Sequence, residues 1–197
     1  TGLWIEGNSD DVKMIRSNFK SIIMNKKLKV IEAMVSPTNF NKLLEENSVS
    51  KEIDLLSIDV DGNDYYIFDA LKVVSPRVII VEYNAKMHPP LKWVMKYNPE
   101  HYWNGSDYYG ASLESFVQLF ALKGYSIVCC NITGCNAFFV RNDLLNDKFC
   151  KPYSAENHYE PARFFLINGM ISGHPTQIGE FEVSYHDGFT EIENSLA

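Results

Sequence analysis

Residues 57–66, SIDVDGNDYY, place three aspartates within six residues, directly after the apolar run Ile53 to Val60. An apolar run without alternation is typical of a strand that is buried on both faces of a parallel sheet. The turn residues that follow, and the apolar side chains that recur at helical spacing beyond them, predict a helix that starts at Asn63 or Asp64. The stretch therefore predicts a strand, a tight turn and a helix.

Similar apolar runs recur along the first part of the chain. Their centres lie roughly 25 residues apart, which is the length of a strand plus a crossover helix. Two further helices are predicted between the runs, one capped by Ser9 and one beginning near Pro37. This alternation predicts an α/β fold with a doubly wound, mostly parallel sheet. The other runs are residues 3–5, 30–35 and 78–81.

The second half of the chain departs from this rhythm. Residues 87–110 are aromatic and rich in turn residues, which is typical of a long loop. A helix is predicted over residues 112–123, because Gly124 supplies a usual C-terminal cap. Two apolar runs, residues 126–132 and 136–141, then follow with a link so short that it permits only an antiparallel hairpin.

Charge divides the chain into two expected parts. Residues 151–197 hold seven acidic side chains against two basic ones, and so account for most of the net charge of -7. We expect a domain over residues 1–150 and an acidic C-terminal arm over residues 151–197, in which the apolar cluster Phe164 to Ile167 must be buried somewhere. The arm is expected to pack over the carboxyl edge of the sheet as a lid, or onto a second subunit to form a homo-oligomer.

Composition excludes several classes of protein. Hydrophobic residues make up 46% of the chain, yet none of its apolar runs approaches the roughly 18 residues that a membrane helix needs. A net charge of -7 argues against a nucleic-acid partner. The four cysteines match no zinc-binding spacing, so we interpret them as reduced, structural thiols in a cytoplasmic protein.

The aspartates of the opening stretch fit no EF-hand. With Gly62 at the sixth position of such a loop, Phe68 stands at the twelfth, where a bidentate glutamate is required. Ligands of open α/β sheets bind outside the carboxyl ends of the strands, and that is where Asp59 and Asp61 lie. Asp61 could instead cap the following helix, as could Asn63 and Asp64. Asp59 lies inside the apolar run, where an unpaired carboxylate would be costly, so we expect it to have a functional role.

Four segments together resemble one known family, over about residues 2–145. They are GLWIEGN (residues 2–8), IDLLSIDVDGNDYYIFDAL (53–71), RVIIVEYN (77–84), and YYGASLESFVQLFALKGYSIV with GCNAFFVRNDL (108–128 and 134–144). Their order and spacing are similar to those of the FkbM-type S-adenosylmethionine-dependent methyltransferases. The resemblance implies a Rossmann-like class I methyltransferase sheet, mostly parallel with a terminal antiparallel hairpin.

One part of the family pattern is not in this chain. The first strand of the family and its glycine-rich turn, which lies against the methionine part of the cofactor, have no counterpart here. The resemblance therefore implies one of two things. Either the natural chain continues before Thr1, or the chain as given cannot hold the cofactor normally.

The resemblance also implies roles for individual residues. Glu6 would bind the ribose hydroxyls of S-adenosylmethionine, Met34 and Val35 would lie near adenine unless they serve only in core packing, and Asp59 would stand beside the cofactor. Related sugar O-methyltransferases bind Mg²⁺ through acidic residues at the ends of two neighbouring strands. Asp59, Asp61 and Glu82 occupy the matching places.

Two further roles concern the acceptor. The catalytic base is either His88, in the loop after the fourth apolar run, or Asp61. Aromatic side chains of the long loop could build a pocket for a sugar ring, or could equally pin the loop to the core. The candidate pocket residues are His101, Tyr102, Trp103, Tyr108 and Tyr109.

Two functions remain open on the sequence. The first is an O-methyltransferase that modifies a small-molecule or glycan acceptor, a sugar or similar polyol, with the help of Mg²⁺. The second is a methyltransferase-like module that binds or assembles without turnover, which the missing first strand favours.

Overall fold

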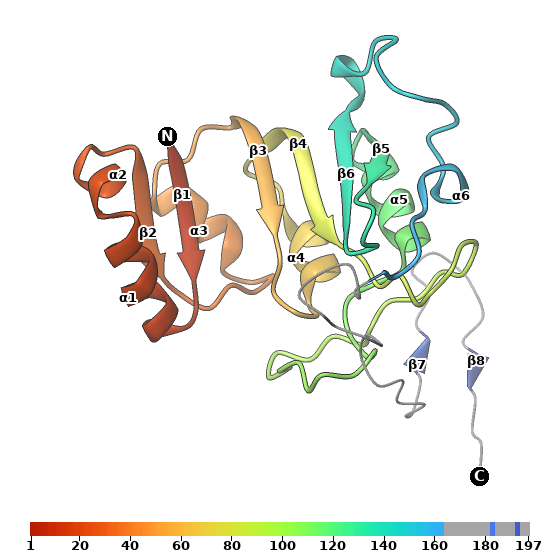
Figure 1. Ribbon diagram of the computed structural model, residues 1–197, viewed down its shortest axis with the longest axis horizontal. Helices are drawn as coiled ribbons and strands as arrows, with labels where there is room; N and C mark the ends of the chain where they lie inside the picture. Colours follow the sequence, from red (N-terminus) through yellow and green to blue (C-terminus); the bar gives the residue numbers. More distant parts are fainter. Residues whose placement is uncertain (164–181, 184–191, 194–197) are drawn as a thin grey trace.

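The computed structural model describes residues 1–163, 182–183 and 192–193, and Figure 1 shows them. Helices and strands alternate along the first half of the chain, and the structure is a mixed α/β fold. The first-half elements are β1 (Gly2–Glu6), α1 (Ser9–Asn18), α2 (Lys20–Met24), β2 (Leu28–Glu32), α3 (Phe40–Glu46), β3 (Glu52–Ile58), α4 (Asp64–Ala70) and β4 (Ser75–Glu82). The second-half elements are α5 (Leu113–Leu122), β5 (Tyr125–Cys130), β6 (Asn136–Arg141), the 3₁₀ turn η1 (Asn142–Leu144), α6 (Ala155–His158), β7 (Glu182–Val183) and β8 (Ile192–Glu193).

The strands form separate sheets and not the single sheet that the sequence predicts. β1 pairs in parallel with β2, and a second sheet has the order β3-β4-β6-β5. Within the second sheet β3 and β4 are parallel, whereas β6 is antiparallel to both β4 and β5. β1 is drawn next to β3 in Figure 1, but the two strands belong to different sheets. The predicted parallel strands and terminal hairpin are present, and the continuous hydrogen-bond ladder between them is not observed in the described residues.

The core lies on the second sheet, where β4 and β6 are the central strands. Ile79 and Val81 of β4 are almost completely buried, whereas Val78 and Ile80 are only half-buried. Burial therefore alternates along the strand, and the predicted burial of both faces is not found. Phe120 of α5 packs against Phe139 of β6 with ring centroids 4.5 Å apart and against Phe68 of α4 at 5.0 Å. These aromatic contacts fix α4 and α5 on the sheet, and so fix the turns at its carboxyl edge.

Two helix starts differ from those predicted. α1 is capped by Asn8 and not by Ser9, because the Asn8 side chain accepts hydrogen bonds from the backbone N–H groups of Asp10 and Asp11. The second predicted helix begins at Phe40, three residues after Pro37, since a turn closed by the Ser36 N–H donating to Asn39 Oδ1 (2.8 Å) comes first. α5 begins after Ser112 and ends before Gly124 (φ +84°), as predicted.

The long segment between β4 and α5 is an irregular loop that is attached to the core. The side chain of Asn84, which is fully buried, donates hydrogen bonds to the carbonyl oxygens of Asp107 (2.7 Å) and Tyr109 (3.1 Å). Trp93 is 2% exposed, and a β-bridge joins Val94 to Ala111. The loop therefore has a defined path over the carboxyl edge of the sheet.

The described beginning of the acidic segment also contacts this edge. Tyr83, at the end of β4, donates to the carbonyl oxygen of Glu160 (2.6 Å), and Tyr159 donates to that of Ala85 (2.5 Å). Arg163 donates to the Ile132 carbonyl in the β5–β6 turn and pairs with Glu160. The cluster Phe164 to Ile167 lies outside the described residues. Among the helices that the structure describes, none is long and apolar enough to cross a membrane.

The thiols are free, and their surroundings predict unequal reactivity. Burial raises the pKa of the Cys130 thiol to about 12 and desolvation also raises the pKa values of Cys129 and Cys135. Cys129 and Cys150 are the two exposed cysteines. Because the thiolate is the nucleophile and burial disfavours it, we expect Cys150 to react with a thiol reagent at pH 8 before the three cysteines whose pKa values are raised. Cys150→Ser should remove the fast phase. A fast phase that survives in Cys150→Ser would contradict this assignment.

Candidate functional site

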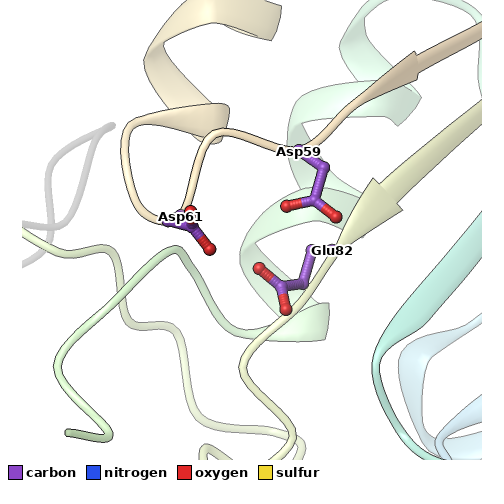
Figure 2. A group of neighbouring side chains, drawn as sticks. All are labelled: Asp59, Asp61 and Glu82. Atoms are coloured by element: carbon purple, nitrogen blue, oxygen red, sulfur yellow. The ribbon is translucent and has the colours of Figure 1, made fainter. Parts of the chain in front are cut away.

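Three carboxylates meet at the carboxyl edge of the parallel pair β3–β4. Asp59 follows the last residue of β3, Glu82 is the last residue of β4, and Asp61 lies in the turn before α4. One carboxylate oxygen from each lies within 4.8 Å of the others. Figure 2 shows the three side chains facing a common space, so the structure brings together residues that are separated by up to 23 positions in the chain.

Local backbone geometry explains how Asp61 reaches this space. Asp64 is 1% exposed, and its carboxylate accepts hydrogen bonds from the backbone N–H groups of Val60 (3.1 Å) and Gly62 (3.0 Å). Asp61 between them has φ +55°, a left-handed conformation that Asp tolerates better than most residues. The turn therefore folds back on Asp64 and directs the Asp61 side chain toward the end of β4.

The site is electrostatically crowded. Burial, and then the charges of Asp59, Asp64 and Asp61, raise the pKa of Glu82 from 4.5 to about 8. Burial also raises the pKa of Asp64 from 3.8 to about 7. Asp59 is exposed to solvent, and not enclosed as its place in the apolar run predicts, yet desolvation by the surrounding chain and the charge of Asp61 still raise its pKa. Like charges at this separation disfavour joint ionisation unless a proton or a cation is shared among them. Such a set of oxygen atoms suits a hard divalent cation.

A family model described as the methyltransferase FkbM domain matches residues 6–116, a span that contains all three carboxylates. The chain belongs to the FkbM methyltransferase family. Comparison with curated proteins and with solved structures gives no significant match.

The FkbM match begins at Glu6, the predicted ribose-binding residue. Glu6 is the last residue of β1, and its Oε1 accepts a hydrogen bond from the backbone N–H of Asn8 (2.9 Å). Past the end of β2, Val35 packs against the core, whereas Met34 is 74% exposed and its sulfur lies directly over Gly7. These residues of the FkbM domain all lie at the carboxyl ends of the first strand pair.

The predicted base and acceptor residues are distributed along the irregular loop of residues 87–110. His88 is exposed, and its ring lies 5.1 Å from that of Tyr159. Tyr109 is 4% exposed, and burial, then the charge of Glu82, raises its pKa, which places it beside the carboxylates. Tyr102, in contrast, is 90% exposed. Trp103 donates from Nε1 to the Ser106 carbonyl (2.9 Å), and Tyr108 packs edge-on against Trp93.

One acid next to the three carboxylates was not predicted in its actual role. The sequence suggests Asp64 as a helix cap, but its carboxylate bonds backward into the turn and is the most buried acid of the group. The position of Gly62 is the signal that could have identified this role of Asp64. A tight turn after a strand brings the backbone N–H groups of the turn together, and a nearby carboxylate can accept hydrogen bonds from them.

Proposed function

We propose that this chain is an S-adenosylmethionine-dependent O-methyltransferase that acts on a hydroxyl group of a sugar or similar polyol with the assistance of Mg²⁺. The observation that carries the proposal is the group of Asp59, Asp61 and Glu82 at the carboxyl edge of a domain from a methyltransferase family. The same proposal takes the small-molecule or glycan acceptor as the partner and the cytoplasm as the location, which four free cysteines support.

The carboxylates fit Mg²⁺ in chemistry and in spacing. They offer oxygen atoms within 4.8 Å of one another, and the raised pKa values of Asp59 and Glu82 indicate a group that gains from a nearby positive charge. Asp59, Asp61 and Glu82 would hold the ion. When bound, Mg²⁺ would supply positive charge that lowers the pKa of an acceptor hydroxyl.

Methyl transfer itself requires alignment and the removal of one proton. The acceptor oxygen forms a bond to the methyl carbon while the bond from that carbon to the sulfonium sulfur breaks, and S-adenosylhomocysteine leaves. The hydroxyl proton passes to a base, for which His88 and Asp61 are the candidates. His101, Tyr102, Trp103, Tyr108 and Tyr109 are the proposed acceptor-side residues, because aromatic faces suit the apolar faces of a sugar ring.

The cofactor site is proposed at the carboxyl ends of β1 and β2, with Asp59 at its inner side. Glu6 would accept hydrogen bonds from the ribose, and Met34 and Val35 would contact adenine. We expect Glu6→Ala to weaken the binding of S-adenosylhomocysteine roughly tenfold or more, because hydrogen bonds to a charged acceptor are lost. Isothermal titration measures the affinity, using the chain together with any natural sequence that precedes Thr1.

A matched control is available on the neighbouring strand. Glu32 is the register partner of Glu6 at the end of β2, and its carboxylate accepts a hydrogen bond from the Ser9 hydroxyl. Glu32→Ala should leave the affinity nearly unchanged. An equal loss in both variants would indicate a general effect on the strand ends and would remove Glu6 from its proposed role.

The alternative proposal is a binding or assembly module without turnover. It is favoured by the separation of β1 and β2 from the second sheet, because the proposed cofactor site spans both. The same titration decides between the two functions. Heat of binding with S-adenosylhomocysteine supports the methyltransferase, and its absence with the upstream sequence present supports the module.

The acidic segment has a proposed role of its own, as a lid on the carboxyl edge or as a contact between subunits of a homo-oligomer. The hydrogen bonds of Tyr159 and Glu160 near the end of β4 support the first of these, since they bring residues 151–163 to that edge.

A further inference from the structure

We infer that His101 is a positioning residue that holds the turn bearing Asp61 in the conformation needed for cation binding. The inference rests on the proposed function, since it assigns a role within the same site. It is carried by a set of contacts between two segments, residues 95–101 of the long loop and residues 61–66 at the start of α4. We call residues 95–101 the clasp.

The clasp is attached to the turn by reciprocal hydrogen bonds. The Asn63 side chain donates from Nδ2 to the Asn98 carbonyl (2.7 Å), and the Asn98 N–H donates back to Asn63 Oδ1 (3.4 Å). Tyr66 donates its hydroxyl hydrogen to the Met95 carbonyl (2.9 Å) and accepts from the N–H of Tyr97 (3.1 Å). The side chains of Asn63 and Tyr66 therefore hold the backbone of residues 95–98 of the clasp in place.

His101 stands at the end of the clasp, directly over the turn. Its Nε2 lies 3.1 Å from the carbonyl oxygen of Asp61, and because a carbonyl only accepts, Nε2 donates in this contact. The Asn98 carbonyl accepts a further hydrogen bond from the His101 N–H (3.0 Å), which sets the ring in place. The Nε2 atom of the imidazole is thus engaged with the backbone of Asp61, a contact that the sequence did not suggest.

The conformation that His101 supports is costly by itself. Asp61 has φ +55°, a left-handed conformation in which Cβ lies too close to a backbone carbonyl oxygen. Contacts from outside the turn are therefore needed to stabilise this conformation. Asp64 binds the turn from within through the N–H groups of Val60 and Gly62, whereas His101 binds it from outside through the Asp61 carbonyl. Release of the outer contact would let the Asp61 carboxylate move away from Asp59 and Glu82.

Gly62 provides an independent test of the same contact. A Cβ at this position would collide with the His101 ring, lying 2.7 Å from Nε2 and closer still to Cδ2, while the other neighbour, Met95 Cε, is 3.2 Å away on a flexible side chain. Gly62 itself is not among the residues with positive φ. An alanine there is therefore compatible with the backbone, and its main cost is displacement of the imidazole.

The experiment compares His101→Ala, Gly62→Ala and the double variant with the wild-type chain. Cation affinity is measured by titration with Mn²⁺ followed by electron paramagnetic resonance, together with the hydrogen exchange of the Gly62 and Asn63 amides. We expect each single variant to weaken Mn²⁺ binding about tenfold and to accelerate exchange at these amides by a similar factor. Gly62→Ala should cost nothing further when His101 is already absent, so the two effects should not add.

A matched control separates positioning from a general loss of a histidine. His158 is also half-buried but belongs to α6, and His158→Ala should leave Mn²⁺ affinity and amide exchange unchanged. Additive effects of the two substitutions, or an unchanged exchange rate at Gly62 in His101→Ala, would overturn the inference. A wild-type chain that binds no Mn²⁺ would contradict the metal in the proposed function, and the exchange data would still decide the role of His101.

Discussion

Asp59→Asn is expected to abolish the binding of divalent cations while leaving the fold intact. The substitution keeps the shape of the side chain but replaces one of three carboxyl groups whose oxygen atoms lie within 4.8 Å of one another. Because a hard cation is held mainly by charged oxygen atoms, we expect an affinity loss of about 100-fold or more, with a parallel loss of any Mg²⁺-dependent methyl transfer. Titration with Mg²⁺ and the release of S-adenosylhomocysteine with a panel of polyols measure the two effects.

Stability gives the internal control for this variant. Burial and the charge of Asp61 raise the pKa of Asp59, so its ionised form costs free energy in the folded chain. Asp59→Asn should accordingly melt at the same temperature as the wild type or higher at pH 7. Asp54→Asn, on the same strand but paired with Arg77, removes an equal charge and should bind Mg²⁺ normally. Unchanged turnover of Asp59→Asn, or of the wild type in EDTA, would remove the metal from the proposed function.

The second large effect concerns Glu82 and pH. Its pKa is raised from 4.5 to about 8, so the carboxyl is protonated in the folded chain over a range where it is ionised in the unfolded chain. The stability associated with this group is complete below about pH 4.5 and is lost as pH rises to about 8. Without divalent cations, we therefore expect the melting temperature of the wild type to fall between pH 5 and pH 8.

Glu82→Gln should reduce that fall. With allowance for partial exposure, we expect the variant to be more stable than the wild type at pH 8 by roughly 2 kcal/mol, or about 4–8 °C in melting temperature. A residual slope should remain, because Asp64 has its pKa raised to about 7. Mg²⁺ at about 100 times its dissociation constant should stabilise the wild type by about 2.7 kcal/mol and the variant by much less. Equal stabilisation of both by Mg²⁺, in thermal melts at pH 8, would show that Glu82 is not a ligand.

The elements themselves could be predicted because each is specified by neighbouring residues. Leu56, Ile79 and Val81 are buried in strands, although Leu55 is 54% exposed and the run 53–60 is buried on one face only. Ser112 and Gly124 bound a helix that was expected between them. Local patterns were insufficient where two adjacent residues compete for one role. Asn8 and Ser9 are both good helix caps, and the choice depends on which of them has extended backbone angles.

The site could be predicted in part for a physical reason. Parallel strands bring their carboxyl ends to one edge, so residues that end consecutive strands, such as Asp59 and Glu82, must converge. Nothing of this kind constrains an irregular loop. The aromatic side chains in residues 87–110 could therefore be chosen as candidates from the sequence, but their positions could not be predicted. Tyr102 is exposed, Tyr109 is buried, and His101 contacts the Asp61 carbonyl.

The separation of the two sheets has a consequence for how the chain melts. Backbone hydrogen bonds join β1 to β2 and β3 to β4, but β1 and β3 belong to different sheets, and Leu3 and Ile5 reach the main core only through side-chain packing. Because no ladder joins β1 to β3, we expect a small unit ending near Glu32 to open separately from a larger unit that contains the carboxylates. A two-state analysis describes only one unit of such a chain. The melting temperatures that report on Asp59 and Glu82 are therefore those of the larger unit, and opening of the smaller one can occur without disturbing them.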